Sequence, residues 1–70
     1  MRTAELEREI RRAAKAAGLS WTMVREAGNH ELWQCGSVRV LNSRHRDLPE
    51  PVAMKVRRDL EPALGKDWWR

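Results

Sequence analysis

The middle of the chain is divided by two glycine-led dipeptides, Gly28-Asn29 and Gly36-Ser37. The short runs around them are rich in β-branched, aromatic and apolar residues, which are typical of strands. A two-residue connection led by glycine suits a tight hairpin, because a type II′ turn needs a positive φ at its first position. We therefore predict a type II′ turn at Gly28-Asn29 and three antiparallel strands, over residues 21–25, 30–35 and 38–41.

Helical periodicity flanks this region on both sides. Between residues 3 and 17 the apolar residues recur every three or four positions, so they share one helical face. We expect Thr3 to be the N-cap of this helix and Gly18 to be its C-terminal stop. A second helix is predicted to begin at Pro51 and to end or kink at Pro62. Its predicted apolar face consists of Val52, Ala53, Val56 and Leu60.

The predicted order of elements, α-β-β-β-α, defines an α+β fold. The apolar faces of these helices and strands are buried most economically if residues 1–70 form a single domain. In that domain, a three-stranded antiparallel sheet has both helices packed on one face. This layout resembles that of double-stranded-RNA-binding domains, which read the shape of the duplex. Those domains usually have a lysine-rich start to the second helix, where this chain has Pro49-Glu50-Pro51. The likeness is therefore topological, and topology alone does not give function.

The small size of the chain limits its chemistry. A 70-residue domain buries only about 60% of the surface that it exposes when unfolded, so we expect any active site to be shallow and exposed. The single Cys35 leaves no internal disulfide, which suits a reducing cytoplasm. No apolar run approaches the ~20 residues of a membrane-spanning helix. We therefore expect a cytoplasmic protein. The spacing of Cys35, His30 and His45 fits no zinc motif, so we expect no metal and no other cofactor.

The formal net charge of +4 is concentrated in one segment. Residues 37–58 carry six Lys or Arg against two acidic residues, whereas the rest of the chain is nearly balanced. Most of the cationic residues are arginines, whose guanidinium groups match the geometry of phosphate oxygens. This segment is predicted to contact a polyanion, with a solvated surface as the alternative.

The stretch Gly28-Asn29-His30-Glu31-Leu32-Trp33 resembles a hallmark of the HicA family of small bacterial ribonuclease toxins. That hallmark is a Gly-Ser-His turn into the second strand, followed by an apolar and an aromatic residue. Residues 43–48 fill the place of the Pro-x-His stretch that often leaves the third strand in this family, with Ser43 where proline is usual. Residues 64–70 are also similar to the ends of some members, so the likeness covers nearly the whole chain. Asn29 departs from the family pattern, because serine is usual there.

The resemblance implies the toxin of a type II toxin–antitoxin system, an endoribonuclease that cleaves mRNA and is neutralised by a HicB-like antitoxin. RNA carries its own nucleophile, the 2′-hydroxyl, so cleavage needs proton transfer and charge stabilisation rather than a metal. Histidine suits proton transfer near neutral pH. The residues implied are His30 as the catalytic acid/base, Asn29 and His45 in support, and Arg39, Arg44 and Arg46 for RNA binding.

Two other classes of function stay open. One is a non-catalytic nucleic-acid-binding module of the same fold, and the other is a degenerate HicA-like protein that acts only through protein interaction. For His30 itself, the alternative to catalysis is a turn histidine hydrogen-bonded to backbone. Trp68 and Trp69 have three open roles: packing on the core, stacking on RNA bases, or docking a partner.

Overall fold

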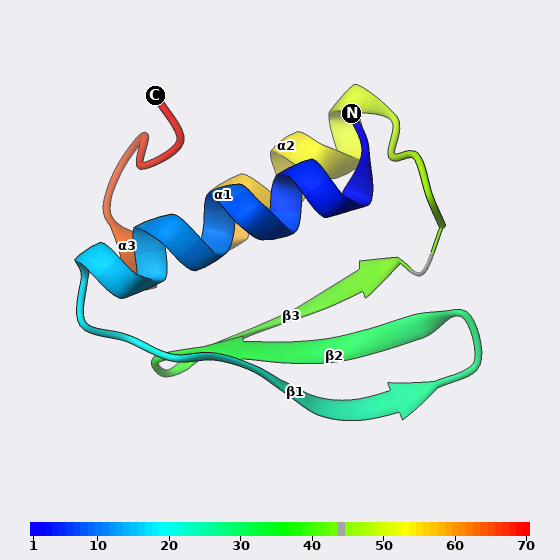
Figure 1. Ribbon diagram of the computed structural model, residues 1–70, viewed down its shortest axis with the longest axis horizontal. Helices are drawn as coiled ribbons and strands as arrows, with labels where there is room; N and C mark the ends of the chain where they lie inside the picture. The colour runs from blue at the N-terminus through cyan, green and yellow to red at the C-terminus, as the bar shows by residue number, and fades with distance from the viewer. Residues whose placement is uncertain (44) are drawn as a thin grey trace.

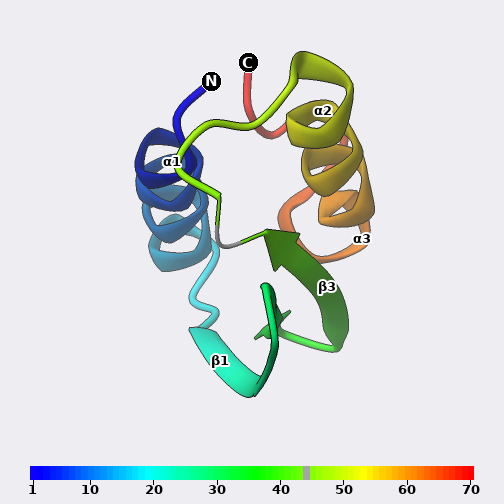
Figure 2. The same ribbon diagram turned by 90° about the vertical axis from the view of Figure 1, so that its right-hand side faces the viewer.

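The computed structural model describes residues 1–43 and 45–70. Its elements are α1 (Thr3–Ala16), β1 (Trp21–Ala27), β2 (His30–Cys35), β3 (Val38–Ser43), α2 (Glu50–Asp59) and α3 (Glu61–Leu64). The strands form one antiparallel sheet in the order β1-β2-β3. Helices α1 and α2 lie on the same face of this sheet and leave the other face open (Figures 1 and 2). The predicted α+β order, α-β-β-β-α, is confirmed.

The hairpin turn before His30 has the predicted geometry. Gly28 has a φ of +58° and Asn29 has no positive φ, as a type II′ turn requires. Ala27 and His30 are paired across the turn, so His30 is the first residue of β2. β1 and β3 each extend beyond their predicted ends, and β1 has an irregularity in its pairing between Met23 and Arg25.

The C-terminus of α1 is a glycine-terminated Schellman motif. Gly18 has a φ of +72°, which glycine adopts without the steric penalty of a side chain. The Leu19 N–H donates to the Ala14 carbonyl at 2.8 Å, and the Gly18 N–H donates to the Lys15 carbonyl at 3.1 Å. This confirms the prediction that Gly18 stops the helix.

The prediction of Thr3 as the N-cap of α1 is wrong. Arg2 occupies the cap position, and Thr3 is the first helical residue. The Thr3 hydroxyl instead donates a hydrogen bond to the backbone carbonyl of His45, and the Thr3 N–H donates to the Arg46 carbonyl at 2.9 Å. The side chain is drawn into this long-range contact because the segment after β3 runs beside the start of α1. These bonds fix the backbone of His45 and Arg46 against the helix.

Helix α2 begins one residue earlier than predicted, with Pro49 as its cap and Pro51 in its first turn. It ends at Asp59, before Pro62, and the chain continues into the short α3. Val52 was expected on the buried face but is 41% exposed, because the helix presents that position beyond the edge of the core. The buried residues of this segment are Ala53, Val56 and Leu60.

Alternation along the strands separates a buried face of the sheet from an open one. Trp21, Cys35 and Val40 point toward the helices and are buried with Leu6 and Ile10 of α1. The intervening positions of β2 and β3, which include His30, Leu32 and Leu41, therefore belong to the open face. Burial raises the pKa of the Cys35 thiol, which is a core residue and not an exposed nucleophile.

Candidate functional site

His30 occupies a fixed position at the end of the sheet. As the first residue of β2 it pairs with Ala27 on one side and Ser43 on the other, so backbone is ordered on both flanks. Its side chain is exposed, and across residues 1–43 and 45–70 the imidazole has no hydrogen-bond partner. The described residues therefore give no support to a turn histidine held by backbone.

His30 lines a hollow of about 440 Å³, which lies within the size range of small-molecule sites. The hollow extends from the open face of the sheet past β3 to the side of α2. Its lining is mixed, because apolar side chains and cationic side chains converge beside the imidazole. The apolar members that matter here are Leu32, Leu41 and Val52, and the charged members are Arg39, Lys55 and Asp59.

The cationic groups of this hollow come from two elements. Arg39 on β3 donates from Nε to Gln34 Oε1 at 3.1 Å, so the guanidinium is oriented along the sheet surface. Lys55 on α2 donates from Nζ to Asp59 Oδ2 at 2.8 Å, in an exposed pair that water weakens. Arg39 is paired with Gln34, four positions along β3 from Ser43, the partner of His30, so the hollow runs along the sheet from the imidazole to the cations. A hollow with an imidazole, two cations and an apolar wall can accept a ligand that has both an anionic and an apolar part.

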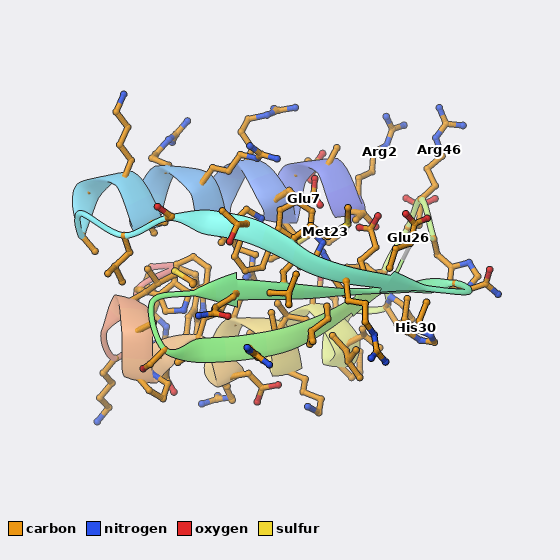
Figure 3. The ribbon with its side chains drawn as sticks, turned by 90° about the horizontal axis from the view of Figure 1, so that it is seen from below. Arg2, Glu7, Met23, Glu26, His30 and Arg46 are labelled. Carbon is orange, nitrogen blue, oxygen red and sulfur yellow. The ribbon has the colours of Figure 1, made fainter. Side chains whose placement is uncertain are left out.

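The structure brings only some of the predicted site residues together. Arg39 shares the hollow of His30, and Asn29 is exposed in the turn immediately before it. His45 and Arg46 line a different hollow, of about 490 Å³, together with Arg2. Figure 3 shows the Arg46 side chain directed toward the α1 side, next to Arg2 and away from His30. Arg44 lies outside the described residues.

Lys55 was missed by reasoning from the sequence, although a signal was present. It lies three positions after Val52 and four before Asp59, a spacing that places all three on one helical face. That face could not be assigned to the site without knowing that α2 packs beside β3. The exposure of Val52 follows from the same packing.

Within the described part of the chain, no cluster of His, Cys, Asp or Glu side chains is arranged to hold a metal ion. No helix among those residues is both long and apolar enough to cross a membrane. No family model matches the chain, and comparisons with curated proteins and with solved structures find no match. The chemistry of the site is therefore argued from its own residues.

Proposed function

We propose that this chain is a HicA-like toxin, an endoribonuclease that cleaves mRNA in the cytoplasm with His30 as its acid/base. The observation that carries the proposal is the exposed imidazole of His30 in one hollow with Arg39 and Lys55. The resemblance of residues 28–33 to the Gly-Ser-His turn of that family supports it independently.

In the proposed reaction, His30 accepts the proton of the RNA 2′-hydroxyl. The 2′-oxygen attacks the adjacent phosphorus, and the bond from phosphorus to the 5′-oxygen breaks. The leaving oxygen takes a proton from solvent or from the Lys55 ammonium, and the products are a 2′,3′-cyclic phosphate and a 5′-hydroxyl. Arg39 and Lys55 stabilise the negative charge that develops on the phosphorane oxygens. Proton transfer of this kind contributes about 10²–10⁴-fold, so a single exposed histidine supports a modest rate.

The apolar part of the same hollow gives the substrate its second contact. Leu32, Leu41 and Val52 form a wall on which a nucleobase next to the scissile phosphate can rest. A base can reach this wall only when it is unstacked and unpaired, which is the state in which proteins usually read RNA sequence. The proposed substrate is therefore single-stranded mRNA.

The open face of the sheet is the proposed docking surface for a HicB-like antitoxin. Leu41 is 65% exposed and Val52 is 41% exposed, and both lie beside His30. A partner that covers these apolar side chains would also close the hollow to RNA. Acidic antitoxin residues opposite Arg39 and Lys55 would speed association and make it sensitive to salt. Amide exchange of the complex should then show protection at residues 28–41.

The test is cleavage of a long single-stranded RNA by purified protein freed of antitoxin. The proposal expects 2′,3′-cyclic phosphate ends, activity in EDTA, and no cleavage of a substrate with 2′-deoxyribose at the scissile position. His30→Ala should abolish cleavage while circular dichroism stays unchanged. The matched variant His45→Ala should retain cleavage, because His45 lines the other hollow. If the wild type binds RNA but leaves it intact, the chain is a binding module instead.

A further inference from the structure

A second hollow of about 440 Å³ lies on the helix layer, between α1 and the C-terminal segment. In both ribbon views this segment lies beside the helices on the side away from the sheet, so the hollow is remote from the open face that bears His30 (Figures 1 and 2). We call it the α1–tail groove. Its lining includes Arg8, Arg12, Ala13 and Ala16 from α1 and Trp68 and Trp69 from the tail.

The two tryptophans are held in place by different contacts. Trp68 Nε1 donates to the Arg57 carbonyl at 2.7 Å, and this ring packs against the core. Trp69 stands edge-on to Trp68 with the ring centroids 5.8 Å apart, and the Arg58 guanidinium lies 5.8 Å from the Trp69 centroid. Both indoles line the groove, together with the small side chains of Ala13 and Ala16. Trp69 is half-buried, so part of its surface stays accessible.

The charge of the groove favours an anion. Arg8 and Arg12 are exposed and have no ion-pair partner among residues 1–43 and 45–70. Glu9 also lines the groove, but it forms a two-point ion pair with Arg57, at 3.0 and 3.1 Å, which offsets its charge. Glu5 is the remaining acidic side chain of the lining, and Arg70 adds a third arginine, so cationic side chains predominate.

We infer that the α1–tail groove binds single-stranded RNA outside the cleavage hollow, with a base against Trp69 and phosphates on Arg8 and Arg12. Tryptophan beside arginine is the combination by which proteins hold single strands without reading their sequence, since every base has a face that can stack. An acidic peptide would satisfy the arginines but leave the indole wall without a flat partner. The choice of RNA rests on the proposed function, whereas the groove itself does not.

The experiment measures binding and not cleavage, so it separates this inference from the proposed function. The full-length His30→Ala variant is titrated with a labelled single-stranded oligouridylate and with an abasic oligomer that has the same phosphates. Adding Trp69→Ala should weaken oligouridylate binding by about 5- to 140-fold, the range measured when one base loses its aromatic partner. Trp69→Phe should retain most of the affinity. The abasic oligomer should bind weakly and should be insensitive to Trp69.

The arginines give a second readout that does not depend on tail packing. Arg8→Gln with Arg12→Gln should reduce the slope of log affinity against log salt by about 1.4, from ~0.7 for each phosphate contact to a single strand. Lys15→Gln removes one charge from the same helix outside the groove and should change the slope little. The inference would be overturned if Lys15→Gln lowered the salt slope as much as the two arginine substitutions did, or if the abasic oligomer bound as tightly as oligouridylate. Binding of polyglutamate in place of RNA would overturn it as well. If binding depends on Trp69 but the wild type cleaves no RNA, the proposed RNA site in the groove is supported and the proposed ribonuclease activity is refuted.

Discussion

Replacing Asn42 with leucine should make the protein more stable. Asn42 is on the helix-facing side of β3 and is only 1% exposed, yet among residues 1–43 and 45–70 neither its Nδ2 nor its Oδ1 has a hydrogen-bond partner. A buried amide without partners costs about 1–3 kcal/mol in proteins, because its hydrogen bonds to water are lost and not replaced. Leucine has the same branched skeleton of four side-chain heavy atoms and removes both polar atoms, so Asn42→Leu should recover most of that cost.

The expected gain of about 1–3 kcal/mol corresponds to a rise in melting temperature of about 4–24 °C for a domain of this size. Urea unfolding followed by circular dichroism should show a higher midpoint with an unchanged slope, since the exposed surface on unfolding stays the same. Asn42→Ala is the matched control. It also removes the amide but leaves a cavity, so it should be less stable than Asn42→Leu by about 2–5 kcal/mol. A loss of stability in Asn42→Leu would refute the reasoning and show that the amide is satisfied in solution.

Three further outcomes follow from contacts in the fold. Because burial raises the pKa of the Cys35 thiol, iodoacetamide should modify it slowly in the native protein and rapidly in urea, as mass spectrometry can show; fast native labelling would contradict its burial. Glu9→Gln should reduce the free energy of unfolding by about 1–3 kcal/mol, since the ion pair with Arg57 is largely shielded from water and its loss leaves the guanidinium poorly paired; an unchanged urea midpoint would show that the pair contributes nothing. Arg39→Gln with Lys55→Gln should slow RNA cleavage about 10-fold or more while folding is unchanged, because both cations line the hollow that is proposed to hold the phosphate, and an unchanged rate would place the phosphate elsewhere.

Local features of the sequence were enough to predict the elements of this fold. Gly28-Asn29 and Gly18 require particular backbone conformations, and the turn and the helix end lie where these residues demand them. The prediction of Thr3 as an N-cap failed because capping propensity reflects only the local sequence. The Thr3 hydroxyl instead donates to the carbonyl of His45, which is distant in sequence. Such a competitor cannot be seen until the segment after β3 is placed beside α1.

The candidate site was only half predictable for the same reason. His30 stood out because it follows a turn dipeptide and begins a strand. Lys55 joins it through the packing of α2 beside β3, whereas His45 and Arg46 turn toward α1 although they follow β3 directly. The place of Trp69 also depended on tertiary structure, since the tail reaches the groove only by folding back against α1.

The central claim is tested most directly by the ends of the RNA products. Wild-type protein, purified without its antitoxin and assayed in EDTA, should convert single-stranded RNA into fragments with 2′,3′-cyclic phosphate and 5′-hydroxyl ends. The His30→Ala protein, with an unchanged circular dichroism spectrum, should produce none. Fragments of the same kind and at the same rate from His30→Ala would contradict the account, because the exposed imidazole at the start of β2 would then have no part in the chemistry.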